Sequence, residues 1–187
     1  MAKIVYLDVE TTGLWENKHA VHQLSGIVEI NGQIVDTFDL QMAPFQGALV
    51  DDKALAVCGV SLNQINAYPP AASQFTKWIS ILDKHLDKTN PKDKYFFAAY
   101  NSPFDEGFMR AMCKRHGNFK FYSQYFYNPS IDIMRVAGLA LMDRIPHMEN
   151  FKLGTVLREL NIEVAGNLHD AMTDITGARQ IFKQCTE

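Results

Sequence analysis

Several features typical of membrane, secreted or polymer-coating proteins are missing from this sequence. No apolar run among its 187 residues is long enough to span a bilayer. Met1 leads directly into a strand-like segment, residues 3–7, with no charged leader, apolar signal core or cleavage site. We therefore expect a soluble, cytoplasmic protein that does not contact a membrane.

Cysteine is scarce as well. Cys58, Cys113 and Cys185 are odd in number, far apart and in no metal-ligand or redox spacing. They are typical of ordinary thiols in a reducing compartment, and none is a candidate for catalysis. His19 and His22 also lack companions at metal-site spacing, so we assign them no ligand role.

Basic side chains do not dominate the composition. The chain has 18 Lys and Arg residues against 21 Asp and Glu residues, a net charge of −3. Coating long stretches of nucleic acid requires many cations that displace counterions from phosphates, so this balance argues against such a protein. It leaves open an enzyme that holds only the end of a strand. The length and the 47% hydrophobic content fit one compact domain over residues 1–187.

The first segment has the alternation of a β-strand, which places Asp8 and Glu10 on one face. Residues 24–30 and 33–40 are β-rich runs separated by Asn31-Gly32, a dipeptide that favours a tight type I′ hairpin. We expect these two runs to pair in antiparallel fashion. The two carboxylates emerge where the first strand must turn, which suits a divalent metal.

The remaining chain alternates helical patterns with one more strand. Apolar residues at helical spacing predict an amphipathic helix from residue 71 to about residue 86, followed by a loop over 88–94. Residues 95–100 form a short apolar run typical of a buried strand. We expect Ser102 to cap the next helix and Pro103 to be its first residue, with the end near Gly117. Further helical patterns cover residues 133–141, 153–160 and 171–182.

This order of elements predicts a mixed α/β sheet covered by helices, with the first strand between the hairpin and the strand at 95–100. Asp105 follows that strand in the first turn of a helix, so it should lie at the carboxyl edge of the sheet beside Asp8 and Glu10. His169 and Asp174 open the last helix and can converge on a shared point. Each feature alone is weak, because acidic residues commonly cap helices.

Three motifs together resemble those of the DEDDh (DnaQ-like) 3′-to-5′ exonuclease family. They are Asp-Val-Glu-Thr-Thr-Gly-Leu at residues 8–14, Tyr-Asn-Ser-Pro-Phe-Asp at 100–105, and His169 with Asp174. The resemblance spans almost the whole chain. It implies a ribonuclease-H-like fold, in which a five-stranded mixed sheet is flanked by α-helices.

The resemblance also implies a two-metal centre. The ligands for two Mg²⁺ or Mn²⁺ ions would be Asp8, Glu10, Asp105 and Asp174. Such ions take hard oxygen ligands and stabilise both the attacking and the leaving oxygen of a phosphodiester. His169 would be the general base, since an unperturbed imidazole, with a pKa of ~6.5, is largely neutral near neutral pH. The tyrosine branch of the superfamily is excluded because Asp170 stands where that tyrosine would be.

Substrate contacts follow from the same resemblance. The backbone around Val9 and Thr11 would hold the terminal nucleotide, and Leu14 and Phe104 would be apolar wedges against its base. Asn101 in the second motif is a further candidate for substrate binding.

The expected function is hydrolysis of single-stranded DNA from the 3′ end with release of nucleoside monophosphates. DNA is favoured because the form of the first motif is common in proofreading subunits; an exoribonuclease is the alternative. An alternative of another class is a non-catalytic module that binds nucleic-acid ends or a partner protein. The chain ends at Glu187, soon after the third motif. A stand-alone enzyme without an evident polymerase partner is therefore the simpler expectation, and homodimerisation stays open.

Two clusters lie outside the motifs. The aromatic segment 119–127 fits either a local core or a surface that stacks on bases, and we favour the core. Lys114, Arg115, His116 and Lys120 form a basic cluster after the second motif. Contact with phosphates and a solvated helix end are equally good interpretations of this cluster.

Overall fold

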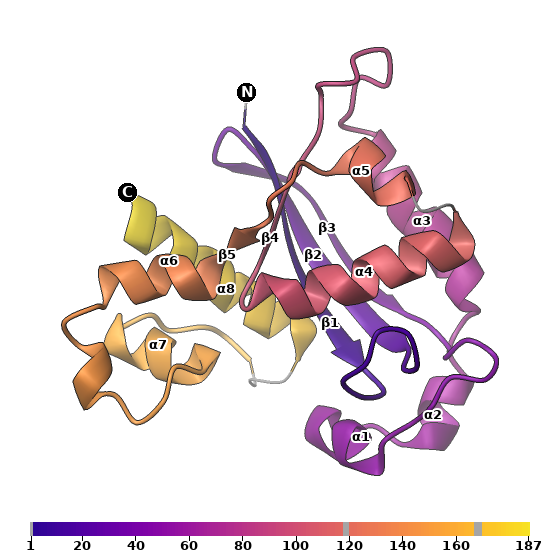
Figure 1. The fold of residues 1–187 in the computed structure, drawn as a ribbon, viewed down its shortest axis with the longest axis horizontal. Helices are drawn as coiled ribbons and strands as arrows, with labels where there is room; N and C mark the ends of the chain where they lie inside the picture. Colours follow the sequence, from indigo (N-terminus) through magenta and orange to yellow (C-terminus); the bar gives the residue numbers. More distant parts are fainter. Residues whose placement is uncertain (1, 118–119, 167–169) are drawn as a thin grey trace.

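The computed structural model describes residues 2–117, 120–166 and 170–187, and in this part of the chain helices cover both faces of a five-stranded mixed sheet (Figure 1). The strands are β1 (Lys3–Thr11), β2 (Val21–Ile30), β3 (Gln33–Gln41), β4 (Phe96–Ala99) and β5 (Ile131–Asp132). The helices are α1 (Asp52–Cys58), α2 (Leu62–Asn66), α3 (Ala71–Asp83), α4 (Ser102–His116), α5 (Phe121–Tyr125), α6 (Ile133–Ala140), α7 (Leu153–Glu159) and α8 (Ala171–Thr186), with a 3-10 turn, η1, at Ile145–His147. The expected fold class is confirmed. None of the described helices is long and apolar enough to cross a bilayer.

The strand order is β3-β2-β1-β4-β5, so β1 lies at the centre of the sheet. It pairs antiparallel with β2 and parallel with β4. The alternation predicted for β1 is confirmed. Leu7 and its neighbours on one face pack against α3 and α4, whereas Tyr6 belongs to the opposite core with α6, α7 and α8. Asp8 and Glu10 share the face of Tyr6.

β1 is much longer than β4, its parallel neighbour in the sheet. Its described pairing with β4 covers Ile4 to Tyr6 against Phe96 to Ala98, but β1 continues to Thr11. The carboxyl half of β1 therefore extends past the end of β4, and the first turn of α4 occupies the space alongside it (Figure 1). This overhang leaves the end of β1 accessible from α4 and from the start of α8.

The predicted hairpin is confirmed. Asn31 and Gly32 have φ angles of 51° and 81°, the positive values that a type I′ turn requires at both central positions. β2 begins three residues earlier than the expected residue 24, at Val21, because the chain already pairs with β1 at that point.

Other boundaries differ from the sequence prediction. α4 begins at Ser102 rather than after it: Asn101 is the N-cap in a left-handed conformation, and the Ser102 hydroxyl instead meets that of Ser130 at 3.1 Å. α3 ends at Asp83, although Leu86 still packs on the core. The short elements α1, α2, α5 and β5 were not predicted, because pieces of two to seven residues carry little periodicity.

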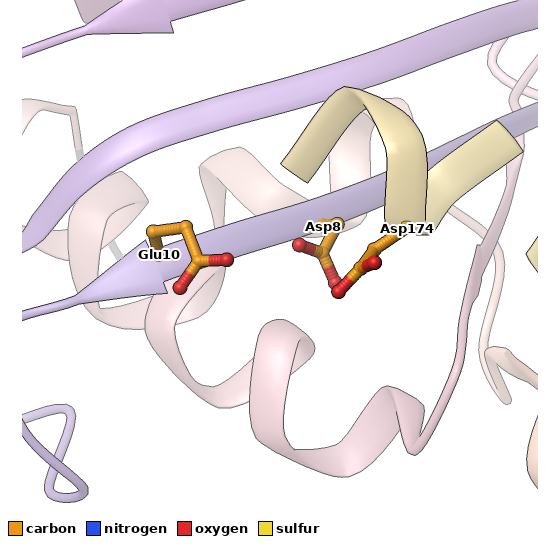
Figure 2. A group of neighbouring side chains, drawn as sticks. All are labelled: Asp8, Glu10 and Asp174. Carbon is orange, nitrogen blue, oxygen red and sulfur yellow. The ribbon is translucent and has the colours of Figure 1, made fainter. Parts of the chain in front are cut away.

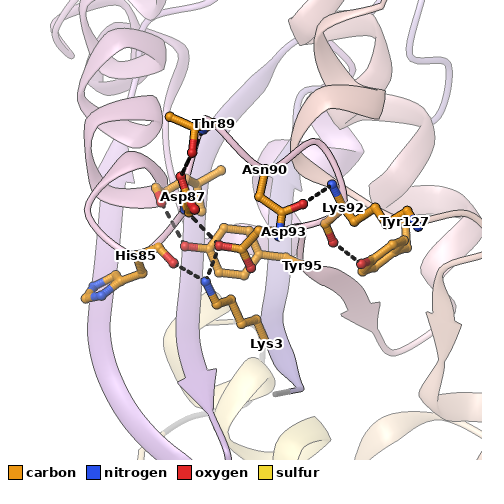
Figure 3. Close-up of polar contacts among 10 residues, drawn as sticks. Lys3, His85, Asp87, Thr89, Asn90, Lys92, Asp93, Tyr95 and Tyr127 are labelled. Carbon is orange, nitrogen blue, oxygen red and sulfur yellow. Dashed lines mark hydrogen bonds and ion pairs between the residues drawn. The ribbon is translucent and has the colours of Figure 1, made fainter.

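The loop after α3 is tied to the first strand (Figure 3). The Lys3 ammonium donates to the His85 carbonyl at 2.5 Å and to the Asp93 carboxylate at 2.6 Å. Asp93 also accepts from the Asp87 N–H at 2.7 Å, which closes the loop on itself. These contacts hold the loop that leads into β4 against the start of β1.

The core interpretation of the aromatic segment is confirmed for Phe121, Tyr122, Tyr125 and Phe126, whereas Tyr127 is half-buried against Phe96. Tyr122, Tyr125 and Phe126 are buried, and Phe126 stacks on Trp78 with ring centroids 6.1 Å apart. Phe119 lies outside the described residues.

A buried ion pair holds α8 on the sheet. The Arg179 Nε and Nη2 atoms lie 2.6 and 2.5 Å from Glu29 Oε2 on β2, and Glu29 is 4% exposed. Lys183 is the next cation, at 3.7 Å from the same oxygen. Because α8 also carries Asp174, this pair contributes to the placement of a candidate site residue.

We expect Arg179→Met to lower the free energy of unfolding by about 3 kcal/mol, since Glu29 stays buried without its main partner. The double variant Glu29→Met/Arg179→Met should recover most of that loss because no lone buried charge remains. Urea denaturation of the three proteins measures both effects. A double variant that is less stable than Arg179→Met would contradict this account of the pair.

Candidate active site

Three carboxylates meet at the carboxyl end of β1. Asp8 and Glu10 project from β1, and Asp174 projects from the first turn of α8. One oxygen of each lies within 4.8 Å of the others. Figure 2 shows the carboxylates of Asp8 and Asp174 pointing toward one another, with Glu10 next along the strand. The structure thus brings together three of the four metal ligands expected from the sequence.

Asp105 lies beside this group rather than in it. It occupies the first turn of α4 and is 3% exposed. Its Oδ1 accepts a hydrogen bond from the Val9 N–H at 3.1 Å, so it occupies the edge of β1 that β4 leaves open. Its position at the carboxyl edge of the sheet is the one predicted.

The negatively charged carboxylates repel one another. Burial raises the pKa of Asp8 well above its usual range, and the neighbouring charges of Asp105 and Glu10 raise it further. Burial likewise raises the pKa of Asp105, against the lowering effect of the hydrogen bond from Val9. Asp174 adds to the repulsion at Asp8.

These residues fit divalent cations. Hard carboxylate oxygens that converge within a few ångströms are the ligand type of Mg²⁺ and Mn²⁺. A bound cation would offset the repulsion among Asp8, Glu10, Asp105 and Asp174, which adds to the effect of burial on the pKa of Asp8.

His169 lies outside the described residues, so its expected role stays a prediction. Asp170 is the N-cap of α8, and its Oδ2 accepts from the Thr173 N–H at 3.1 Å and from the Thr173 hydroxyl at 3.0 Å.

The five candidate substrate residues differ in exposure. Val9 and Thr11 are buried, and the Thr11 hydroxyl donates to the Gly13 carbonyl at 2.8 Å, so only their backbone is left for a substrate contact. Leu14, in contrast, is 70% exposed. Phe104 packs on Phe108 with ring centroids 5.0 Å apart. Asn101 is exposed at the start of α4 in a left-handed conformation.

The loop that presents Leu14 is firmly held. A Cβ at Gly13 would lie 2.2 Å from the His19 ring, so only glycine permits this close approach. The His19 Nδ1 in turn accepts from the Trp15 N–H at 3.1 Å. Trp15 itself is 65% exposed. Two large apolar side chains are therefore displayed on a fixed loop directly after β1.

Sequence reasoning missed two neighbours of the carboxylates. The Cys58 thiol at the end of α1 donates to Glu10 Oε2 at 2.9 Å, and burial, with a further contribution from Glu10 and Asp8, raises the pKa of this thiol. Asp132, at the end of β5, adds to the negative charge around Asp105. No sequence signal marks either residue, because both approach the centre from elements that are too short to predict.

The basic cluster after the second motif is divided by the fold. Arg115 lies over the Phe45 ring at 3.6 Å, and the His116 ring lies 5.4 Å from that of Phe75. Lys114 is exposed. A hollow of about 520 Å³ lies elsewhere, between the loop after α3 and α5. Two of its lysines are already engaged: Lys88 pairs with Asp83, and Lys94 donates to the Ser123 carbonyl.

Comparison with known proteins agrees with this geometry. The family model for exonucleases named RNase T matches residues 5–182. The chain belongs to the RNase T exonuclease family. The resemblance to DEDDh exonucleases noted in the sequence is therefore confirmed.

Curated relatives of this exonuclease domain are much longer proteins. It is 27% identical over 170 residues to the PolC-type DNA polymerase III of Bacillus cereus, an alignment that covers 91% of this chain and 10% of the polymerase. The PolC-type polymerase of Clostridium perfringens is 22% identical, with coverages of 96% and 11%. The chain thus spans about a tenth of the length of these relatives.

Solved structures share the fold of this exonuclease domain. E. coli exonuclease I in complex with a dT13 oligonucleotide has a TM-score of 0.76 at 18% identity, covering 100% of this chain and 41% of that one. The nuclease domain of 3′hExo, a DEDDh family member bound to rAMP, has a TM-score of 0.68 at 20% identity, with coverages of 97% and 90%.

The acidic cluster predicts a pH-dependent stability. Asp8→Asn should stabilise the metal-free protein by about 1 kcal/mol at pH 7, or raise its Tm by about 2–4 °C. The folded pKa of Asp8 lies above the unfolded value of ~3.9. Below pH ~3.9 Asp8 is protonated in both the folded and the unfolded state, so its ionisation does not destabilise the wild type there. The free energy of unfolding of the wild type falls as the pH rises toward the folded pKa. The stability gain from Asp8→Asn should therefore vanish near pH 4.

Thermal denaturation in the presence of a chelator between pH 4 and 8 measures this gain. Asp143→Asn, at an exposed position, is the charge-matched control and should change little. Added Mn²⁺ should raise the Tm of the wild type and much less that of Asp8→Asn. A gain from Asp8→Asn that is equal at all pH values would contradict the assignment.

Proposed function

We propose that this chain is a divalent-metal-dependent 3′-to-5′ exonuclease that hydrolyses single-stranded DNA from its 3′ end and releases nucleoside monophosphates. The observation that carries the proposal is the convergence of Asp8, Glu10 and Asp174 within 4.8 Å at the end of the central strand. Asp105 completes the acidic set from the adjoining edge. Membership of an exonuclease family supports phosphodiester hydrolysis as the reaction class.

The candidate residues have three different roles in this proposal. Asp8, Glu10, Asp105 and Asp174 would hold two Mg²⁺ or Mn²⁺ ions, which supply positive charge to the attacking and leaving oxygens. His169, which precedes Asp170 in the sequence, would accept the proton of the attacking water. Leu14 and Phe104 contact the terminal base, and the backbone of Val9 and Thr11, together with Asn101, contacts the terminal nucleotide.

DNA is the favoured polymer. The curated relatives are DNA polymerases, and the structure of exonuclease I holds a DNA oligonucleotide. The alternative, RNA, is supported by two other structural neighbours, one bound to rAMP and one described as recognising a histone mRNA stem-loop. Discrimination depends on how the site treats the 2′-hydroxyl.

A non-catalytic binding module is the alternative from another class. Four acidic side chains around one point destabilise the fold unless cations bind there, and a pure binding surface has no need of them. The presence of all four acidic residues therefore favours the enzyme. We propose that residues 1–187 act as one exonuclease domain.

The first prediction from this proposal concerns products. Purified protein with Mg²⁺ or Mn²⁺ should shorten a 5′-labelled single strand stepwise from its 3′ end, and DNA should be degraded faster than RNA of the same sequence. Asp8→Ala, which removes a metal ligand, is the control against contaminating nucleases and should be inactive. Cleavage of neither polymer by the wild type would favour the binding module, and faster cleavage of RNA would reverse the choice of substrate.

The second prediction concerns the base. His169→Ala should lower kcat at least ~100-fold, the usual contribution of a general base. Wild-type kcat should rise with pH through ~6.5, where an unperturbed histidine loses its proton, and the variant should lack this step. The increase in Tm on adding Mn²⁺ should remain in the variant, because His169 is not a metal ligand in this proposal. Parallel pH profiles of the two proteins would remove His169 from the role.

A further inference from the structure

A cleft of about 270 Å³ opens directly beside Asp174, between α8 and α7. Its other lining residues come from α7 and the segment that leads into it, and the polar ones are Glu149, Asn150, Lys152, Thr155 and Arg158. The cleft therefore begins at one of the converging carboxylates and continues onto a surface with two cations. The function proposed above assigns no role to these residues.

Both cations are available to a ligand. Lys152 is exposed, and the side chain of Arg158 is 72% exposed. Arg158 lies 3.6 Å from Glu149, whose side chain is 78% exposed. An ion pair in such a position contributes at most ~1 kcal/mol, so an anion can replace Glu149 at little cost.

The wall that carries these cations is fixed by hydrogen bonds. Asn150 Oδ1 accepts from the Lys152 N–H at 3.0 Å and from the Thr155 hydroxyl at 2.8 Å. The Tyr100 hydroxyl, at the end of β4, donates to the Phe151 carbonyl at 2.7 Å. The backbone at Lys152 is thus tied both to α7 and to the strand that precedes the second motif. Arg158 is six positions after Lys152, a rise of about 9 Å along the helix axis, so the two side chains reach different charges of an extended anion.

The two flanks of the acidic centre differ in character. In Figure 1, α7 lies to one side of the carboxyl end of β1, and the loop after β1 lies to the other with α1. The loop displays the exposed Leu14 and Trp15, whereas the α7 side offers Lys152 and Arg158. A single strand has the same two faces, apolar bases and a charged backbone, and protein contacts to the backbone position the strand.

We propose that the cleft between α7 and α8 binds phosphates of the substrate strand upstream of its 3′-terminal nucleotide, with Lys152 and Arg158 as the contacting residues. The inference rests on the proposed function, because the strand end must lie at the carboxylates for its upstream phosphates to reach this cleft. The cations beside Asp174 offset the repulsion that the acidic centre exerts on the next phosphates.

The test compares wild type with Lys152→Gln/Arg158→Gln. Binding of a short fluorescent oligothymidylate is followed by anisotropy in the presence of a chelator, so that no cleavage occurs. Each phosphate contact with a single strand contributes ~0.7 to the slope of log K against log salt, so the slope should become shallower by about 1.4. Between 50 and 200 mM salt the wild type should then lose roughly sevenfold more affinity than the variant.

A second readout separates binding from chemistry. The p-nitrophenyl ester of thymidine 5′-monophosphate has no upstream phosphates, so its hydrolysis should be unchanged in the variant, whereas KM for the oligonucleotide rises. Lys77→Gln/Lys92→Gln removes the same charge from exposed positions away from the cleft and should match the wild type in every assay.

Three outcomes would overturn the inference, and a fourth would overturn only the proposed function. An unchanged salt slope in the cleft variant, or equal loss of ester hydrolysis, would overturn the inference. Binding of an acidic peptide that the cleft variant loses while oligonucleotide binding stays constant would assign the cleft to a protein partner and overturn it too. If the variant loses strand binding but the wild type cleaves neither ester nor polymer, the cleft stands and the proposed function fails.

Discussion

Repulsion among carboxylates at the end of β1 is the constraint that the rest of the architecture must meet. Asp8 and Asp105 both have raised pKa values, with burial as the main cause and neighbouring acidic groups as a further one. Unconstrained side chains would relieve that repulsion by moving apart, so holding them together lowers the free energy of unfolding. Conformational stability elsewhere offsets this cost, as is usual where a protein prepares a charged site.

Three elements hold the acidic groups in place. β1 is fixed because it is paired on both sides along its first half. α4 is attached to the overhanging half through the hydrogen bond from Val9 to Asp105. α8 is held by the buried pair of Arg179 with Glu29, about one and a half turns along the helix from Asp174. The acidic centre therefore depends also on contacts outside it, such as the strand pairing of β1 and the pair of Arg179 with Glu29.

The surroundings of the centre are asymmetric. A rigid loop, supported by the contact of Gly13 with the His19 ring, displays apolar side chains on one flank. On the other flank Lys152, directly before α7, and Arg158, within α7, present positive charge beside a hydrogen-bonded backbone. In a protein with a net charge of −3, such a local pair of cations has a larger effect on where a polyanion lies than the overall charge does.

The sequence by itself determined the fold class, the hairpin at Asn31-Gly32 and the identity of the acidic residues, because alternation, turn chemistry and motif spacing are local properties of the chain. It did not determine the short elements α1, α2, α5 and β5, whose few residues have no clear period. Only the tertiary structure decided the hydrogen bond from Val9 to Asp105, the contact of the Cys58 thiol with Glu10, and the position of Lys152 and Arg158 beside Asp174. Those contacts join segments far apart in the chain, and their geometry is set by packing of whole elements rather than by local preference.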